Sequence, residues 1–536
     1  MLKVLTLLLA THMLYAAADF TSLQSAAVSD EYVLKLNGNK SYIGANAAAS
    51  LLNVKLLKEL SEQSNSILVQ ASQAKVNEIQ HHPMVEYIEP NYIYSLRSLP
   101  NDNYFAKLWG LNNTGQADPG GNNGVAGMDI NAIKGWKINH QAKDVIIGVI
   151  DTGINHQAED LKNNMWVNDK ELNGLPGIDD DENGYIDDIH GFDFVNLDSD
   201  PMDDHSHGSH VAGIIAAEGN NHIGVTGVAW SAQLMALKFL DARGTGTLAN
   251  AILAIDYASE NGARITNNSW GGGHSIALQE AIQRAEEKGI LFVAAAGNSS
   301  LDNEKYPNYP SSYENENIIA VAAMDNEGKK ARFSSWGNKS VDIAAPGQSI
   351  FSTARVDYKT LSGTSMATPY VTGALALLFQ DNPDMKAKEA KARLLNTSRP
   401  SSYFKNKSVS EGVLDLYALL SNTNSAPHPD DPGFWPSIDY SLSSAHPYEN
   451  NLEQEYEINV PEAKAFAIYF KKFETEKNYD KLKIYDASDK LVSELSGNHS
   501  DTFSPVIPGK RARLVFKSDN TLNAYGFEIS KLMIKK

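Results

Sequence analysis

Between residues 100 and 421, short apolar runs alternate with longer stretches of helical spacing. The run at 144–150 (D-V-I-I-G-V-I) is typical of a strand whose two faces are both covered. The predicted strands are 144–150, 233–240, 264–267, 290–295 and 318–322, and the predicted helices are 211–217, 247–260 and 275–288. This alternation predicts an α/β domain with a mostly parallel central sheet between layers of helices. In such sheets, functional residues gather beyond the carboxyl ends of the strands.

The segments on either side of this domain have different patterns. Residues 19–99 combine strand-like alternation with one helical stretch, which predicts a small α+β unit. Residues 422–437 contain four prolines and no apolar period, so we interpret them as a linker. Residues 438–536 alternate only as strands do, which predicts a small β-sandwich.

Composition and the first residues narrow the class of protein. The net charge of −19 argues against nucleic acid as a partner, and the absence of cysteine excludes disulfides and thiolate chemistry. Lys3, the apolar run at 4–10 and the small residues at 16–18 form an export signal that we expect to be cleaved after Ala18. Because no stretch approaches about 20 apolar residues, we expect an exported protein without a membrane span, extracellular or, in a two-membrane bacterium, periplasmic.

Ser365 precedes an apolar run at 370–379 that predicts a buried helix. A serine at a helix N-terminus lies near free N–H groups and the positive end of the helix dipole, which favour developing negative charge. Gly363 would let a substrate approach closely, and we expect Pro369 in the first turn, where its missing N–H costs nothing. Taken alone, the pattern favours an ordinary helix cap over a nucleophile.

Two further polar residues stand beside glycine at predicted element boundaries. Asp151 directly follows the strand at 144–150, and His207 comes just before the helix at 211–217. A serine hydroxyl needs a base to take its proton, a histidine can accept and return that proton, and a buried carboxylate can orient the histidine. Asp151, His207 and Ser365 are available for these roles, although Asp151 alone would also fit an Asx turn.

A zinc site is an alternative interpretation of the same histidines. His205, His207 and His210 are close in sequence, with Asp203 and Asp204 beside them. However, the stretch lacks the H-E-x-x-H arrangement that places a general base beside zinc. A zinc hydrolase is therefore the competing hypothesis for this region.

Seven motifs in one order resemble those of the subtilisin-like serine protease (subtilase) precursors. They are V-I-D-T-G-I at 149–154, H-G-S-H-V-A-G at 207–213, N-N-S-W-G-G at 267–272, A-A-A-G-N at 294–298, F-S-S-W-G at 333–337, A-A-P-G at 344–347 and S-G-T-S-M-A-T-P at 362–369. The chain order Asp, His, Ser is that of subtilisin, and the serine lacks the G-x-S-x-G elbow of the α/β-hydrolases.

The resemblance implies a three-layer subtilisin-like fold and a secreted serine endopeptidase that acts on proteins or peptides through an acyl-enzyme. It implies Asp151, His207 and Ser365 as the catalytic triad and Asn298 as an oxyanion donor, with His210 in a structural role. It also implies an S1 pocket wall and an edge that pairs with extended substrate. The wall residues are Ser269, Trp270 and Gly271, and the edge residues are Gly244, Thr245 and Gly246.

The acidic stretch at 178–188 predicts a calcium site, since bound calcium would stabilise an exported protein without cysteine. Its candidate ligands are Asp179, Asp181, Asn183, Asp187 and Asp188. The alternation before Gly184 resembles half an EF-hand, but His190 occupies the twelfth position, and an acidic solvated loop is the alternative. The family's calcium loop suggests a second, weaker site at Asp160 and Asn221.

The resemblance also covers the flanking segments. It implies that residues 19–99 are an inhibitory propeptide that occupies the active-site cleft and is removed autocatalytically near 94–101. Residues 438–536 resemble a CUB-like domain, in which Glu476, Asp480 and Asp519 could bind calcium and whose ligand would be protein or carbohydrate. The alternative function is an inactive subtilase fold acting as a calcium-dependent binding module, which would require the loss of a catalytic residue.

Overall fold

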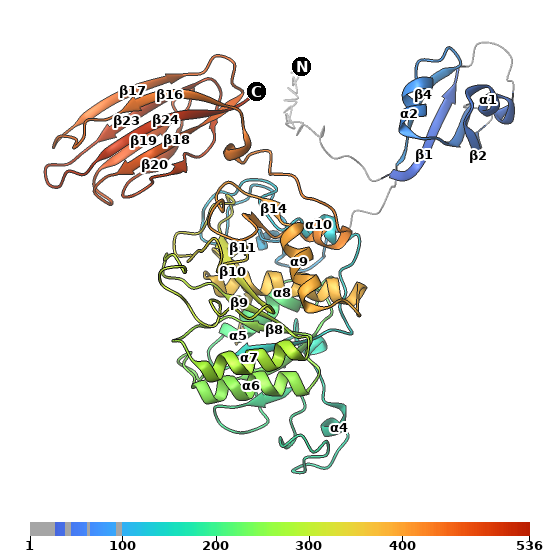
Figure 1. Cartoon of the computed structure of the whole chain (residues 1–536), viewed down its shortest axis with the longest axis vertical. Helices are drawn as coiled ribbons and strands as arrows, with labels where there is room; N and C mark the ends of the chain where they lie inside the picture. Colours follow the sequence, from blue (N-terminus) through green and yellow to red (C-terminus); the bar gives the residue numbers. More distant parts are fainter. Residues whose placement is uncertain (1–26, 38–43, 62–64, 93–98) are drawn as a thin grey trace, which may run out of the picture. The chain divides into compact units, whose positions relative to one another are not determined.

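The computed structural model describes residues 27–37, 44–61, 65–92 and 99–536, and the chain divides after Ser98 into two compact units (Figure 1). The expected export signal at 1–18 and most of the expected maturation region at 94–101 lie outside the described residues. Among the described residues, no helix is both long enough and apolar enough to cross a membrane.

The first unit is a four-stranded antiparallel sheet in the order β2-β3-β1-β4 with two helices. Its elements are β1 Ala27–Leu36, α1 Ala45–Leu52, β2 Lys55–Ser61, β3 Ser66–Gln70, α2 Gln73–Ile79 and β4 Val85–Tyr92. The sequence predicted a small α+β unit but missed α1 and β2. Helix α1 buries Ala45, Ala48, Ala49 and Leu52, a helical spacing that the high alanine content had obscured.

A nine-stranded sheet forms the middle of the second unit, in the order β14-β15-β11-β10-β9-β8-β5-β7-β6. All neighbouring strands are parallel except the antiparallel pair β14 and β15. The strands are β5 Ile146–Asp151, β6 Gly191–Asp193, β7 Gln233–Lys238, β8 Ile265–Asn268, β9 Leu291–Ala295, β10 Ile318–Met324, β11 Ile343–Pro346, β14 Arg399–Pro400 and β15 Gly412–Val413. The predicted mostly parallel sheet is confirmed.

Helices cover both faces of this sheet. Residues that point to opposite faces of a strand therefore lie in different apolar clusters. Ile147 and Val149 of β5 lie in one apolar cluster, whereas Ile150 lies in the other. Helices α5 and α8 belong to the first cluster, and α6 and α7 lie side by side over the opposite face (Figure 1). The principal helices are α5 His207–Ala216, α6 Leu248–Glu260, α7 Ile276–Glu287, α8 Thr364–Asp381, α9 Ala387–Asn396 and α10 Leu416–Ser421.

Local chemistry explains where several helices begin. The hydroxyl of Thr247 accepts a hydrogen bond from the N–H of Asn250, and that of Ser275 accepts one from Leu278, so α6 and α7 begin behind side-chain caps. Helix α8 begins at Thr364, which makes Pro369 its sixth residue. The expectation that Pro369 lies in the first turn is therefore wrong, and its missing N–H does remove a helical hydrogen bond.

The chain ends in a sandwich of two antiparallel sheets around a core rich in phenylalanine. One sheet has the order β16-β24-β18-β21, with β22 also paired to β18, and the other has the order β17-β23-β19-β20. The strands are β16 Ser437–Ser443, β17 Glu453–Asn459, β18 Ala465–Glu474, β19 Lys481–Tyr485, β20 Leu491–Leu495, β21 Thr502–Phe503, β22 Ile507–Pro508, β23 Arg511–Lys517 and β24 Gly526–Lys535. This agrees with the predicted all-β C-terminal domain.

Candidate active site

Asp151 and His207 meet at the carboxyl end of β5. Asp151 is the last residue of β5 and fully buried, and His207 is the first residue of α5. Their side chains are joined by a hydrogen bond of 2.7 Å between His207 Nδ1 and Asp151 Oδ1. The main-chain N–H of Thr152 donates to the same carboxylate oxygen at 2.8 Å. The carboxylate therefore favours the tautomer that carries its proton on Nδ1, which leaves Nε2 as a base.

A second buried carboxylate, Asp203, supports this pair and was not predicted as a site residue. It accepts hydrogen bonds from the hydroxyl of Thr152 and the N–H of Ser209, both at 2.9 Å, and so connects the end of β5 to the first turn of α5. Burial lowers the pKa of His207, but the negative charges of Asp151 and Asp203 outweigh burial and raise that pKa above its usual value.

This electrostatic arrangement gives a pH prediction. With His207 as the expected base, we predict that the acidic limb of kcat/KM follows the protonation of His207 in the free enzyme, because only the neutral ring can accept the serine proton. Asp203→Asn removes a negative charge that favours the imidazolium, so the pKa of His207 should fall and the limb should move to lower pH. A pH profile of peptide hydrolysis measures this. The control is Asp384→Asn, an exposed site beyond the far end of α8, which should leave the limb in place. An acidic limb that does not move in the Asp203 variant would refute the effect of Asp203 on the pKa of His207.

Ser365 and Asn298 meet at the N-terminus of α8. The side-chain oxygen of Asn298 accepts hydrogen bonds from the N–H of Thr364 at 2.8 Å and from its hydroxyl at 3.0 Å, which fixes the orientation of the amide. A Cβ placed on Gly363 would lie 3.5 Å from both Asn298 Nδ2 and Ser365 N. The amide nitrogen of Asn298 and the main-chain nitrogen of Ser365 therefore both lie near Gly363, where the two expected oxyanion donors are needed. Thr364 was not predicted as part of this site.

The hydroxyl of Ser365 donates to the main-chain carbonyl of Ser269 at 3.0 Å. Among the described residues, no hydrogen bond joins this hydroxyl to His207. Helices α5 and α8 nevertheless pack directly against each other, on the same face of the sheet. Hydrogen bonds between catalytic groups are often formed only when substrate is bound, so this geometry is compatible with a nucleophile and its base.

The two predicted substrate-binding segments lie beside these residues. The segment from Ser269 to Gly271 follows β8, and the side chain of Trp270 packs against Phe239 at 4.9 Å between ring centroids. A Cβ on Gly271 or on Gly297 would lie within 3.4 Å of the side chain of Asn308, so this polar side chain stands between the two segments. Nothing in the sequence indicated that Asn308 belongs here.

The segment at Gly244, Thr245 and Gly246 forms a tight turn closed by Asp241. That carboxylate accepts hydrogen bonds from both the N–H and the hydroxyl of Thr245, at 3.0 and 2.9 Å. Gly244 has a φ of 72° and lies beside the ring of His205, two residues before His207. The turn is therefore next to the Asp–His pair, at the place where an extended substrate could pair with it.

The three histidines of the zinc hypothesis do not converge. His210 is fully buried, and its Nε2 lies 3.1 Å from the carbonyl of Ile350 and 3.0 Å from that of Lys359, so this nitrogen carries a proton. Burial lowers the pKa of His210 to about 3, which keeps the ring neutral. His210 therefore has the structural role that the family resemblance implied.

Residues 142–420, just over half of the chain, match the model of the subtilase family, Peptidase S8. The chain belongs to the subtilase family. Residues 436–530 match the CUB domain model, so the C-terminal sandwich is a CUB domain.

Similar proteins include subtilisin-like protease 1 of Plasmodium berghei (strain Anka), which is 39% identical over 300 residues, or 52% of this chain and 50% of that protein. Thermitase of Thermoactinomyces vulgaris is 36% identical over 302 residues, or 56% of this chain and 91% of that protein. A crystal structure of a cold adapted subtilisin-like serine proteinase is 29% identical, with a TM-score of 0.46, and covers 57% of this chain and 97% of that one. The chain thus spans about half the length of its Plasmodium berghei relative.

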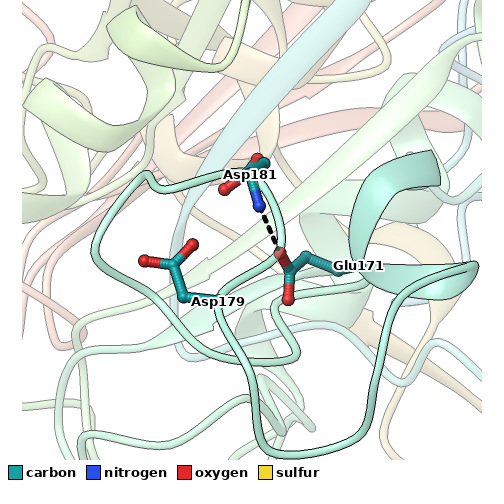
Figure 2. Close-up of side chains that lie close together, drawn as sticks. All are labelled: Glu171, Asp179 and Asp181. Carbon is teal, nitrogen blue, oxygen red and sulfur yellow. Dashed lines mark hydrogen bonds between the residues drawn. The ribbon is translucent and has the colours of Figure 1, made fainter.

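The subtilase domain contains an acidic group in the insertion that precedes β6. Glu171, at the short helix α4 Asp169–Leu172, lies beside Asp179 and Asp181 of the predicted calcium loop (Figure 2). One carboxylate oxygen of each lies within 4.8 Å of the others. Three oxygen ligands at this spacing suit the hard cation Ca²⁺. The sequence indicated the two aspartates but not Glu171, which comes seven residues before the acidic stretch.

The other predicted ligands of this loop hold the protein itself together. Asp187 accepts from the N–H of Gly177, and Asp188 is fully buried, where it accepts from the amide of Asn183 at 2.9 Å and from the hydroxyl of Tyr257. The group of three carboxylates does not include Asp187 or Asp188. They fix the shape of the loop that carries it.

The second predicted calcium site is a closed hydrogen-bond cluster. Asn221 Nδ2 donates to Asp160 at 3.0 Å, and the same carboxylate accepts from the N–H of Val225 at 2.8 Å and from the hydroxyl of Tyr358 at 2.9 Å. Burial raises the pKa of Asp160. Nearby Asp102, which the sequence did not indicate, accepts two bonds from the N–H of Asn220. The carboxylates of Asp160 and Asp102 are therefore the two candidate cation ligands beside this loop.

The CUB domain brings together the three acidic residues that its sequence suggested. Glu476, Asp480 and Asp519 each place a carboxylate oxygen within 4.8 Å of the others. Asp480 is fully buried and accepts a hydrogen bond from Tyr448. This group is a further candidate calcium site, in the CUB domain and not in the subtilase domain.

Proposed function

We propose that this subtilase is a secreted serine endopeptidase that hydrolyses peptide bonds through an acyl-enzyme. The observation that carries the proposal is the 2.7 Å hydrogen bond between buried Asp151 and His207, formed in a chain of the subtilase family. The positions of Asn298 Nδ2 and Ser365 N beside Gly363 support it, because acyl transfer needs donors where negative charge develops.

In the proposed reaction, Ser365 Oγ attacks the carbonyl carbon of the scissile peptide while His207 Nε2 takes its proton. The carbonyl oxygen becomes negatively charged and accepts hydrogen bonds from Asn298 and from the N–H of Ser365. His207 then gives the proton to the leaving amine, and the acyl group stays on Ser365. Water, deprotonated by His207, attacks this ester, and His207 returns the proton to Ser365 Oγ as the second product is released. Asp151 stabilises the imidazolium that forms in each half of the reaction.

We also propose that the enzyme is made as a zymogen. Residues 19–99 would act as an inhibitory propeptide, and the enzyme would remove them itself. The separate compact α+β unit ahead of the subtilase domain is consistent with this role. The expected substrates are proteins and peptides bound in an extended conformation along Gly244–Gly246, and the CUB domain would bind a protein or carbohydrate ligand.

Calcium is the cofactor that these residues fit. The carboxylates of Glu171, Asp179 and Asp181 are close enough to share one cation. Main-chain N–H groups donate to Glu171 and Asp179, but three negative charges at this spacing still repel one another. Bound calcium would neutralise this charge and stabilise the loop. It would take no part in the chemistry at Ser365.

Removing calcium is expected to lower the melting temperature of the mature protein. A cation present at 100 times its dissociation constant stabilises the folded state by about 2.7 kcal/mol per site. Differential scanning calorimetry with calcium and with EDTA measures the shift. Glu171→Gln should reduce it, whereas Glu182→Gln, an exposed site in the same loop, should not. Equal melting temperatures with calcium and EDTA would contradict the stabilising role.

Inhibitor classes distinguish the competing functions. Casein hydrolysis that is abolished by a fluorophosphonate and unaffected by a zinc-specific chelator supports the serine peptidase. Loss of activity with the chelator alone would favour zinc chemistry. A purified, fully processed protein that neither hydrolyses casein nor reacts with the fluorophosphonate would favour the inactive binding module.

A further inference from the structure

One carbonyl at the start of α8 lacks its normal helical partner, and it belongs to Ser365. In an α-helix, the N–H of each residue donates to the carbonyl four residues earlier. Pro369 has no N–H and lies four residues after Ser365. A proline ring also crowds the carbonyl at that position, so the backbone of the proposed nucleophile is not fixed by the helix in the usual way.

The side chain of Ser269 replaces the missing donor. Its hydroxyl donates to the carbonyl of Ser365 at 2.9 Å, while the hydroxyl of Ser365 donates to the carbonyl of Ser269 at 3.0 Å. Ser269 is only 4% exposed, so water does not compete well for either bond. The two serines therefore form a reciprocal pair between the end of β8 and the first turn of α8.

A buried hydrogen-bond chain fixes the direction of the Ser269 hydroxyl. Asn267 Nδ2 donates to Ser269 Oγ at 3.0 Å, and the hydroxyl of Thr372 donates to Asn267 Oδ1 at 2.9 Å. Asn267 and Thr372 are fully buried. Because Ser269 Oγ accepts from Asn267, its own proton is free for the carbonyl of Ser365. Asn267 belongs to β8, between β5 and β9 in the middle of the sheet.

We propose that Ser269 is a positioning residue for the nucleophile. Its hydroxyl supplies the hydrogen bond that Pro369 cannot, and it thereby ties the backbone of Ser365 to the central sheet. Holding this carbonyl fixes the residue that carries both the attacking Oγ and one oxyanion N–H. The inference rests on the proposed role of Ser365, and it goes beyond the expected role of Ser269 as a wall of the substrate pocket.

A double-mutant cycle tests this role in the mature full-length enzyme with calcium. Ser269→Ala should lower kcat by about 10- to 100-fold with KM changed less than about twofold, because a small displacement of a reacting group is costly. Pro369→Ala restores an N–H that can donate to Ser365. In that background, Ser269→Ala should lower kcat by less than about threefold, and the two changes should be strongly coupled. Peptide hydrolysis and the rate of fluorophosphonate labelling are the readouts.

Two further variants control the cycle. Thr368→Val removes a hydroxyl that donates to the carbonyl of Thr364 at 2.9 Å. The main-chain N–H of residue 368 can still donate to that carbonyl, so no helical donor is missing there. Its effect should therefore be the same in the wild-type and Pro369→Ala backgrounds. Ser269→Thr keeps the hydroxyl and should retain most of kcat. Equal losses from Ser269→Ala in both backgrounds would overturn the proposal.

Stability measurements separate this inference from the proposed function. If Ser269→Ala fails to fold, the double variant should fold, and a double variant that also fails would contradict the proposal. If the wild-type protein hydrolyses nothing, the peptidase assignment fails, but thermal unfolding of the same four proteins still measures the coupling between Ser269 and Pro369. Additive melting-temperature changes would then refute the hydrogen-bond replacement.

Discussion

Ser365→Ala is expected to abolish peptide-bond hydrolysis and to leave the chain as an unprocessed precursor. The hydroxyl is the only atom of this residue that forms the acyl-enzyme, and alanine removes it without disturbing the helix start. In subtilisin, a member of the same family, loss of the nucleophile lowers kcat by about 10⁶-fold, and we expect a comparable loss. The remaining rate would come from the oxyanion donors and substrate binding alone.

Electrophoresis and intact mass after expression in isolation measure the processing, and a peptide substrate measures kcat. Ser362→Ala is the matched control, because this exposed serine lies three residues before Ser365 and its hydroxyl accepts only a structural bond from the N–H of Ser349. The control should mature normally. A Ser365→Ala protein that matures when expressed alone would rule out self-processing.

Asn298→Leu is expected to lower kcat by about 10²- to 10³-fold with little change in KM. This magnitude is the one known for the corresponding donor of subtilisin, and the physical reason is general. The amide contributes only when the carbonyl oxygen becomes an oxyanion, so its loss affects the transition state and not substrate binding. Leucine has a similar shape but cannot donate.

Thr364→Val provides the comparison. It removes the hydroxyl bond to Asn298 Oδ1 but keeps the main-chain bond of 2.8 Å, so the amide should stay partly oriented and the loss of kcat should be smaller. Steady-state kinetics on one peptide substrate measure both variants. A rise in KM with unchanged kcat for Asn298→Leu would show that the amide binds ground-state substrate instead of the oxyanion.

The central sheet could be predicted because its strands are apolar on both faces. Strands β9 and β10 contain only apolar residues, and β5 is apolar up to its last residue, Asp151. The helices between the strands have a clear period, so both the parallel arrangement and the layers follow. The elements that were missed are the ones with weak patterns. Half of the residues of helix α1 are alanine, and β11 and β15 are short strands in the sheet interior.

The candidate site also contains residues with a clear sequence signal and residues without one. Asp151, His207 and Ser365 stand at element ends beside glycine, which is a local signal, and the family motifs assign their roles. Asp203 and Glu171 gave no comparable signal, because their roles depend on chain segments that only the fold brings together. Asp203 lies three residues before Ser206, the N-cap residue of α5, so the usual capping position did not indicate it.

The first residue of α8 decides what Pro369 does in the structure. If α8 began a few residues later, Pro369 would lie in its first turn and would remove no helical hydrogen bond. Ser269 would then need no role beyond the wall of the substrate pocket. With α8 beginning at Thr364, the proline leaves the carbonyl of Ser365 to the side chain of Ser269. The end of a helix is the least predictable part of it, and here that end carries the proposed nucleophile.

The most direct test of the central claim is to trap the acyl-enzyme. Mature protein is mixed with an activated ester or peptide ester, quenched in acid within the first turnovers, and digested for mass spectrometry. We expect the acyl group on the peptide that contains Ser365, and none in Ser365→Ala. An acyl group on another residue, or hydrolysis of the substrate without any acylated protein, would contradict the proposed mechanism.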